Sequence, residues 1–307
     1  MTDGGACAIL APAKVNLFLE VGGRREDGFH QIDTLFQAVS LWDRVRVERR
    51  GADVVLTVDG PDLGPAEKNL AVRAARLFLE EVGSREGVRL DLAKGIPAGA
   101  GLGGGSSDAA AVLRALNRLW GGCLPRGRLT ELGSAVGSDV AFFLGTSPLA
   151  RGTGRGELLE PLPPLPPADL VLVLPPVHVA TGGAYAALTR SRAGVPTTFG
   201  ASSRLPRGWA DVASLARNDF QDVVAGIHPE VARSLEALRR AGGRPTLLSG
   251  SGAACFGVFP DEASARDAAA RLRADLGWSA TAVRTLAAFP APGSLDAPGL
   301  EGVSPHG

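Results

Sequence analysis

Apolar and polar residues alternate strictly near the start of the chain. Over residues 13–21, the apolar side chains fall on one face of an extended strand, and Lys14, Asn16, Phe18 and Glu20 fall on the other. A repeat of two residues predicts a half-buried β-strand. Shorter apolar stretches predict further strands over residues 45–48, 54–58, 88–93, 169–174 and 253–259.

Apolar residues spaced three and four apart predict amphipathic helices. The clearest one follows a glycine-rich loop and carries Ala109, Val112, Leu113, Leu116, Leu119 and Trp120 on one face. In this helix we expect Ser106 or Ser107 as N-cap and Asp108 in the first turn, where its charge suits the helix dipole. Gly121 and Gly122 are expected to end it. Further helices are predicted over residues 68–82, 129–136, 182–190, 230–241 and 262–275.

Strands and helices are mixed in both halves of the chain, which predicts an α+β fold. Residues 161–168 read Pro-Leu-Pro-Pro-Leu-Pro-Pro-Ala and cannot sustain a helix or a central strand. We therefore predict an N-terminal domain over residues 1–162 and a C-terminal domain over residues 163–289. Residues 290–307 are rich in Pro, Gly and Ser and are predicted to be a disordered tail.

The loop before the clearest helix predicts a phosphate site. Glycine lets backbone N–H groups approach an anion closely, and a helix N-terminus adds unpaired N–H donors and partial positive charge. The candidate phosphate-binding residues are Pro97, Ala98, Gly99, Ala100, Gly101, Leu102, Gly103, Gly104, Gly105, Ser106 and Ser107.

Two common nucleotide loops fit this segment poorly. A Walker A loop needs a lysine after its last glycine, and here Ser106 follows Gly105. A dinucleotide fingerprint matches Gly99, Gly101 and Gly104, but no Asp or Glu stands between residues 109 and 130 to hold a ribose. A flexible linker is disfavoured, because the loop runs directly into a helix.

Composition narrows the class of protein. The 307 residues include 32 basic and 32 acidic side chains, so nothing points to nucleic acid or a membrane surface as a partner. The three cysteines have no metal-site spacing, and His178, His228 and His306 do not cluster with other ligands. We see no secretory signal and no apolar run long enough to span a membrane, so we expect a cytoplasmic protein.

Two pairs of residues could carry chemistry at a phosphate site. Lys14, on the polar face of its strand, and Asp139, in an apolar stretch, could meet and activate a substrate hydroxyl. Taken singly, Lys14 could be a solvated strand lysine and Asp139 a helix N-cap. Phe29 and His30 could stack on a base and bond its edge, or could be a core residue and a surface residue.

Together these segments resemble the GHMP small-molecule kinases, over about residues 10–288. The loop from Pro97 resembles that superfamily's P-x-x-x-G-L-x-S-S signature, and Ser249–Gly252 resembles its second glycine motif. Within the superfamily, the chain resembles the branch that acts on a cytidine diphosphate-linked methylerythritol. The segments that indicate this branch are residues 12–19, 27–30, 103–110 and 137–140.

The resemblance implies a ribosomal S5 domain 2-like N-terminal domain, a ferredoxin-like C-terminal domain and an active site between them. It implies ATP and Mg²⁺ as cofactors, and phosphorylation of the 2-hydroxyl of 4-diphosphocytidyl-2-C-methyl-D-erythritol in the non-mevalonate isoprenoid precursor pathway. The protein is then expected to be a monomer or a weak homodimer that binds a small molecule.

The resemblance also implies roles for single residues. Asp139 corresponds to the catalytic base and Lys14 to its partner, and Ser107 is the candidate magnesium ligand. Phe29 and Tyr185 correspond to the aromatics that enclose the cytosine, His30 to a residue that bonds it, and Asn16 to the substrate's edge. Two positions depart from the usual pattern, since Phe29 replaces a common tyrosine and Ala141 a frequent proline.

Three other functions remain open at this stage. The first is a GHMP kinase for another alcohol, such as homoserine or mevalonate, in which Phe29 and His30 would have no cytosine to hold. The second is an ATP-binding regulatory or structural protein with a dead site, which the presence of both Lys14 and Asp139 disfavours. The third is a nicotinamide dehydrogenase, which lacks its ribose carboxylate here.

Overall fold

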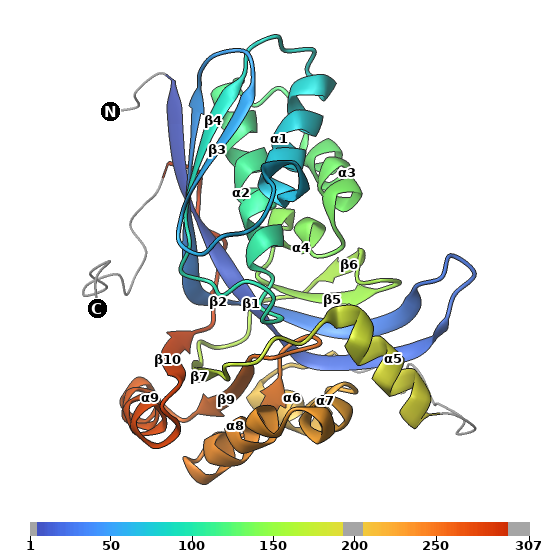
Figure 1. Ribbon diagram of the computed structural model, residues 1–307, viewed down its shortest axis with the longest axis vertical. Helices are drawn as coiled ribbons and strands as arrows, with labels where there is room; N and C mark the ends of the chain where they lie inside the picture. Colours follow the sequence, from blue (N-terminus) through green and yellow to red (C-terminus); the bar gives the residue numbers. More distant parts are fainter. Residues whose placement is uncertain (1–4, 193–204, 294–307) are drawn as a thin grey trace.

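The computed structural model describes residues 5–192 and 205–293, which form two sheets with helices against them (Figure 1). The first sheet has the order β3-β4-β2-β5-β6, with β1 also paired along β2. All its pairings are antiparallel except β3 with β4. Its strands are β1 (Ala6–Arg24), β2 (His30–Arg49), β3 (Val54–Asp59), β4 (Val88–Ala93), β5 (Leu149–Thr153) and β6 (Leu158–Pro161).

The long strands β1 and β2 are buried on both faces at their centre. Ala13, Val15 and Leu17 of β1 belong to a core that also contains Leu172 and Phe256 of the second sheet. The opposite face is covered too, since Lys14, Asn16 and Glu20 are at most 4% exposed. The prediction of a half-buried strand over residues 13–21 is therefore wrong. The second sheet packs on the apolar face, and the polar side chains of the other face are enclosed by partners such as Thr34, Asp139 and Arg217.

Four helices pack in the half of the molecule that contains the first sheet (Figure 1). They are α1 (Leu70–Glu81), α2 (Gly104–Leu119), α3 (Arg126–Val136) and α4 (Val140–Leu144), with a short 3₁₀ turn at Ala66–Lys68. Asn69 caps α1 by accepting a hydrogen bond from the Ala71 N–H. The helices predicted over 68–82, after the glycine-rich loop and over 129–136 are confirmed as α1, α2 and α3.

The start of α2 differs from the prediction. Its N-cap is Gly103 in the left-handed conformation, so Ser106 and Ser107 lie inside the helix and neither caps it. Asp108 consequently lies beyond the first turn, buried rather than facing solvent at the dipole. Gly121 and Gly122, both at positive φ, end the helix as predicted.

The second sheet is antiparallel with the order β10-β7-β9-β8. Its chain order, β7, helices, β8, β9, helix, β10, is the βαββαβ arrangement of ferredoxin-like domains. One face of this sheet meets β1, and the other is covered by helices. The strands are β7 (Asp169–Leu174), β8 (Thr246–Leu248), β9 (Cys255–Phe259) and β10 (Ser279–Arg284). The helices are α5 (Thr181–Ser191), α6 (Trp209–Leu215), α7 (Gln221–Ile227), α8 (Pro229–Arg240) and α9 (Glu262–Leu276).

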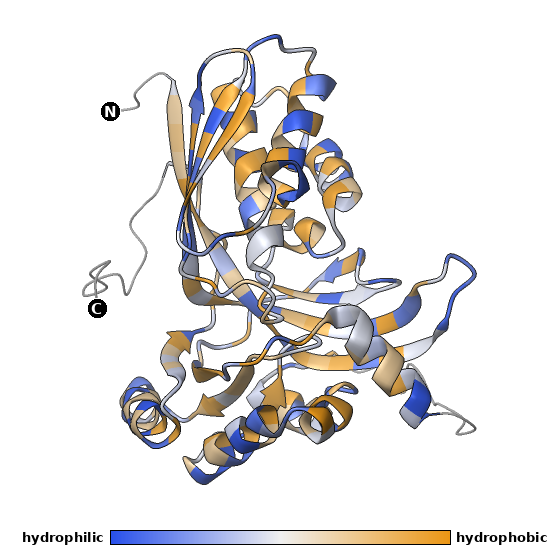
Figure 2. Cartoon of the chain, in the orientation of Figure 1, coloured by the Kyte–Doolittle hydropathy of each residue, from blue (hydrophilic) through white to orange (hydrophobic). Residues whose placement is uncertain are grey.

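Hydropathy follows this layering. Figure 2 shows apolar residues along the strands, and hydrophilic residues on the outward sides of α8 and α9 and at the tip of the β1–β2 hairpin. Within the described ranges, 5–192 and 205–293, no helix combines the length and apolarity needed to cross a membrane.

The chain passes from the first sheet to the second between Pro161 and Asp169. It then returns, because the Leu286 N–H donates to Ala38 O, the Phe289 ring packs edge-on against Phe142, and the Gly293 N–H donates to Ala8 O. The last described residues therefore pack on the first sheet. The rest of the predicted tail, 294–307, lies outside the described residues.

Candidate active site

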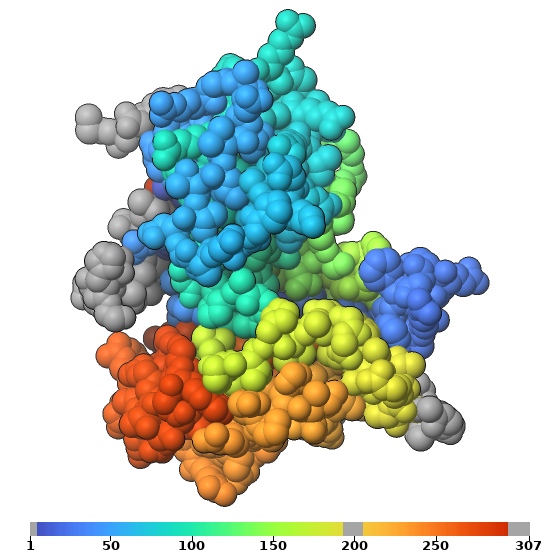
Figure 3. All heavy atoms as spheres, viewed as in Figure 1, coloured from blue at the N-terminus to red at the C-terminus, as the bar shows by residue number. Residues whose placement is uncertain are grey.

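A cavity of about 1140 Å³ lies where the two halves of the molecule meet. The glycine loop lines it at Gly101 and Gly103, and helix α5 lines it through Tyr185. The β1–β2 hairpin forms another wall and projects beside α5 (Figure 3). Residues from both halves of the molecule thus reach one cavity.

Lys14 and Asp139 meet in this cavity. The Lys14 Nζ atom lies 3.7 Å from Asp139 Oδ2 and donates a 2.7 Å hydrogen bond to Asn16 Oδ1. Asn16 in turn donates to Thr34 Oγ1, so the asparagine that binds the lysine is itself held in place. Burial lowers the pKa of Lys14, and the charge of Asp139 opposes that shift.

The open alternatives for these two residues are now decided. Lys14 is only 4% exposed, so it is not a solvated strand lysine. Asp139 occupies the N-cap position of α4, but its side chain makes no capping hydrogen bond and stays free to face the cavity.

The glycine loop is held tightly between β1 and the turn Ser249–Gly252. The Lys14 N–H donates to Leu102 O, and Ser249 Oγ donates to Gly101 O. Gly101 has φ +79°, and a Cβ there would lie 2.1 Å from Ser249 O. Because any side chain would collide with that carbonyl, only glycine fits at this position.

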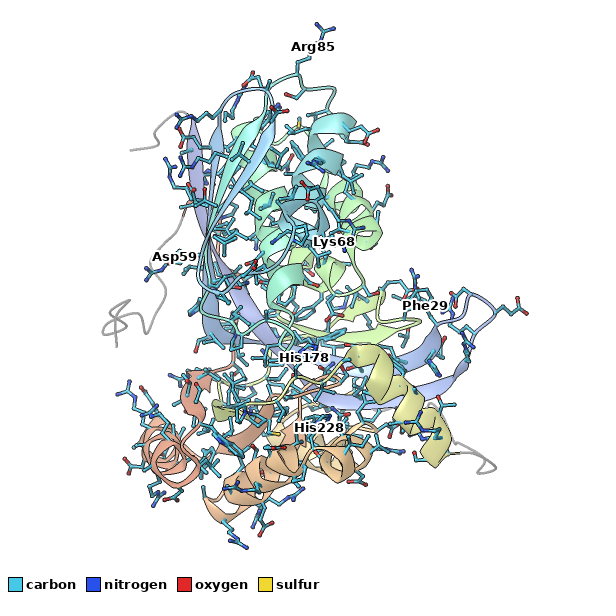
Figure 4. The ribbon with its side chains drawn as sticks, in the orientation of Figure 1. Phe29, Asp59, Lys68, Arg85, His178 and His228 are labelled. Atoms are coloured by element: carbon cyan, nitrogen blue, oxygen red, sulfur yellow. The ribbon has the colours of Figure 1, made fainter. Side chains whose placement is uncertain are left out.

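His178 comes from the second half of the chain and lies beside the start of the glycine loop, where the two halves of the molecule meet (Figure 4). A Cβ on Gly99 would lie 3.1 Å from the His178 ring. His228 lies lower in the second half, apart from His178 (Figure 4). In the part of the chain that the structure describes, no three His, Cys, Asp or Glu side chains form a metal-binding group.

Aromatic rings gather at the other end of the cavity. The His30 and Tyr185 rings stack with their centroids 4.8 Å apart and their planes 24° from parallel, and Phe220 meets Tyr185 edge-on. Phe29 is at the hairpin (Figure 4), 53% exposed, with the Arg155 guanidinium 4.8 Å above its ring. Phe29 is therefore no core residue, and it is His30 that faces Tyr185. Burial, followed by the charge of Arg24, lowers the pKa of His30.

Comparisons with known proteins agree with this geometry. The family model "GHMP kinases N terminal domain" matches residues 69–146, and "GHMP kinases C terminal" matches residues 205–277. A 4-diphosphocytidyl-2-C-methyl-D-erythritol kinase of Geobacter sp. (strain M21) is 42% identical over 284 residues, covering 91% of this chain and 98% of the relative. The chain belongs to this kinase family.

Further relatives support the assignment. The kinase of the same name from Pelotomaculum thermopropionicum is 43% identical, covering 86% of this chain and 93% of its own length. A crystal structure of 4-(cytidine 5'-diphospho)-2C-methyl-D-erythritol kinase has TM-score 0.75 and 40% identity, covering 91% of this chain and 98% of its own. A homoserine kinase from Cytophaga hutchinsonii, at 18% identity and TM-score 0.69, shares the fold.

The protein is thus an ATP-dependent small-molecule kinase with the two-domain GHMP fold that the sequence predicts. The reading as a kinase for another alcohol is not favoured, because the similar structure of a homoserine kinase has far lower identity than the cytidyl-substrate kinase.

Sequence reasoning missed a buried cluster beneath the glycine loop of this kinase. Lys94 Nζ lies 2.6 Å from Asp108 Oδ2 and also contacts Asp43, and none of the three side chains is more than 3% exposed. Asp43 Oδ1 accepts from the N–H groups of Gly95 and Ile96, just before the loop. Lys94 directly follows β4, and the alternation of that strand, if continued, places it on the same face as buried Val88, Leu90 and Leu92. A lysine at a position expected to be buried is the sequence feature that could have indicated the cluster.

Two side-chain oxygens among the described residues are buried without a hydrogen-bond partner, Ser107 Oγ and Asp108 Oδ1. Asp108 belongs to the Lys94 cluster, which leaves Ser107 Oγ as the candidate for a magnesium ion. Ser107 Oγ is buried on the first turn of α2 and has no hydrogen-bond partner. Since Mg²⁺ is usually held by one or two protein oxygens together with substrate phosphates and water, this hydroxyl fits such an ion beside a nucleotide.

Proposed function

We propose that this kinase transfers the γ-phosphoryl group of ATP to the 2-hydroxyl of 4-diphosphocytidyl-2-C-methyl-D-erythritol, a step of the non-mevalonate isoprenoid precursor pathway. The observation that carries the proposal is the pair of buried Lys14 and half-buried Asp139, 3.7 Å apart, in a cavity that the glycine loop and aromatic rings also line. The match to the Geobacter relative of this name covers nearly all of that relative's length.

The loop from Pro97 to Ser107 binds the ATP phosphates. Gly99, Gly101 and Gly103 all have positive φ, a backbone conformation that presents N–H groups to an anion without steric cost. The following helix α2 directs its N-terminus at the same place. Mg²⁺, held by the nucleotide and Ser107 Oγ, would neutralise phosphate charge.

Asp139 accepts the proton of the attacking hydroxyl. Phosphoryl transfer needs positioning and charge neutralisation more than covalent chemistry, so one carboxylate within reach of the hydroxyl suffices. Lys14 lies beside it and provides positive charge near the phosphoryl group in transit. Asn16 fixes the lysine and marks the edge of the substrate site.

The aromatic end of the cavity holds the cytosine. His30 provides a hydrogen-bonding edge, and Tyr185 and Phe29 provide stacking faces. In the structure His30 itself stacks on Tyr185, so the base has to share or take that space. Stacking on these rings would favour a substrate that carries a base over one that does not.

The test is ATP consumption by the purified protein in the presence of magnesium. The substrates 4-diphosphocytidyl-2-C-methyl-D-erythritol (called the cytidyl alcohol below), homoserine and mevalonate are assayed side by side. The proposal expects turnover with the cytidyl alcohol alone. Turnover with homoserine or mevalonate instead would keep the kinase assignment and remove the base-binding role from Phe29 and His30.

A further inference from the structure

Asn218 connects the two halves of the molecule next to the active site. It lies between α6 and α7, where residues 217–219 run beside Leu19 of β1. The Leu19 N–H donates to Arg217 O at 2.8 Å, and the Asp219 N–H donates to Leu19 O at 3.0 Å. Asn218 is 6% exposed, so its polar side chain requires partners inside the protein.

Its carboxamide is fully used by the backbone around it. Nδ2 donates to Leu248 O at 2.7 Å and to Gly250 O at 2.8 Å, the two carbonyls that flank Ser249. Oδ1 accepts from the Phe220 N–H at 2.9 Å. Among side chains of this size, only an amide donates two hydrogen bonds at one end and accepts at the other.

The turn that Asn218 holds contacts the reacting end of the cavity. Ser249 Oγ donates to Gly101 O at 3.0 Å. A Cβ built on Gly250 would lie 3.4 Å from Lys14 Nζ. Ser251 Oγ lies 3.1 Å from Thr181 Oγ1 at the start of α5. A shift of this turn would therefore displace the glycine loop and, at the same time, change the contacts around Lys14.

We infer that Asn218 is a positioning residue for phosphoryl transfer, which fixes the turn Ser249–Gly252 against Gly101 and Lys14. The inference rests on the proposed function for the identity of the reacting groups. It adds that the phosphate end of the site is completed by a side chain that contacts neither ATP nor the alcohol.

Asn218→Asp tests this with little change in shape. A carboxylate oxygen in place of Nδ2 would repel the carbonyls of Leu248 and Gly250, while Oδ1 can still accept from Phe220. The kcat is expected to fall at least tenfold. The Kd of the cytidyl alcohol, measured by calorimetry, is expected to stay within twofold, because the Phe220–Tyr185 contact is kept.

Asn117→Asp is the matched control. Asn117 also bonds a backbone segment through both ends of its carboxamide, with Nδ2 donating to Leu124 O and Oδ1 accepting from the Leu124 N–H, far from the cavity. It is expected to lower the melting temperature with unchanged kcat. If its kcat falls as much as that of Asn218→Asp, or if Asn218→Asp stays within twofold of the wild-type kcat, the inference is wrong.

A second variant decides the matter if Asn218→Asp does not fold. Ser249→Ala removes the hydrogen bond to Gly101 at the other end of the same chain of contacts, and it too is expected to lower kcat at least tenfold. A kcat within twofold of wild type would overturn the inference.

Failure of the proposed function can be told apart from failure of this inference. If the wild-type protein phosphorylates a different alcohol, the same kcat and Kd comparison is made with that alcohol. If it phosphorylates none, the Kd of a non-hydrolysable ATP analogue is compared instead. A fivefold weaker Kd in Asn218→Asp supports the inference, and an unchanged Kd contradicts it.

Discussion

The buried cluster of Lys94, Asp43 and Asp108 should make the stability of the protein depend on pH in an unusual direction. Two carboxylates and one ammonium group are enclosed together, so full ionisation would leave a buried negative charge. Burial and then the charge of Asp43 raise the pKa of Asp108 to about 7, although Lys94 opposes the shift. The cluster therefore retains a proton that an exposed carboxylate would lose.

The size and sign of the effect follow from the shift. The pKa of Asp108 rises from its ordinary value of 3.8 to about 7 on folding, a difference of roughly three. At about 1.4 kcal/mol per unit, this is on the order of 4 kcal/mol. Below about pH 4 both states hold the proton, and between about pH 4 and pH 7 only the folded state does. The stabilisation is therefore complete at the acid end of this window and is lost as pH rises to 7.

Asp108→Asn isolates this contribution, because asparagine has nearly the shape of the protonated acid and does not titrate. Urea unfolding at several pH values from 4.5 to 8 gives the free energy of unfolding of both proteins. We expect the free energy of unfolding of the variant, relative to that of the wild type, to increase by a few kcal/mol as pH rises across this range.

Glu236→Gln is the control. Glu236 pairs with Arg240 on the surface of α8, and such a pair contributes at most about 0.5 kcal/mol. Its difference from wild type should be nearly constant with pH. A constant difference for Asp108→Asn as well, within about 0.5 kcal/mol, would refute the reasoning and mean that Lys94 keeps Asp108 ionised.

Three further substitutions test the site. Asp139→Asn should lower kcat about 100-fold or more, the usual contribution of a general base, while calorimetry shows an unchanged Kd for an ATP analogue; near-native turnover would contradict the base assignment. His30→Ala should weaken binding of the cytidyl alcohol by about 1–3 kcal/mol, seen as a higher KM, and an unaltered KM would argue against its role. Gly101→Ala should raise the KM for ATP at least tenfold and lower the melting temperature, because its Cβ would meet Ser249 O at 2.1 Å. Gly127→Ala, which meets nothing within 4 Å, should leave both values near wild type.

Regular local patterns predicted the fold well where one element makes its own signal. Residues 88–93 form β4 with the predicted bounds, and residues 262–275 lie within α9. By contrast, β2 extends over 20 residues, of which only 45–48 were predicted. Asp33, Thr34 and Gln37 interrupt its apolar pattern, and they can be buried there because Arg151, Phe18 O and Ala38 O satisfy them.

The candidate site divides in the same way. The glycine loop could be proposed as a phosphate site from the sequence, because glycine content and a following helix are local features. That Lys14 and Asp139 meet could only be proposed, since residues 125 positions apart are brought together by tertiary packing. The Lys94 cluster and Asn218 were missed because their importance comes from partners on other elements.

The most direct test of the central claim is identification of the product by ³¹P NMR. Wild type and Asp139→Asn would each be incubated with ATP, magnesium and 4-diphosphocytidyl-2-C-methyl-D-erythritol. The account predicts a new phosphomonoester on the 2-hydroxyl, with the diphosphate intact, for wild type, and almost none for Asp139→Asn. A phosphate on another hydroxyl, no new phosphomonoester with wild type, or equal product from the variant would contradict it.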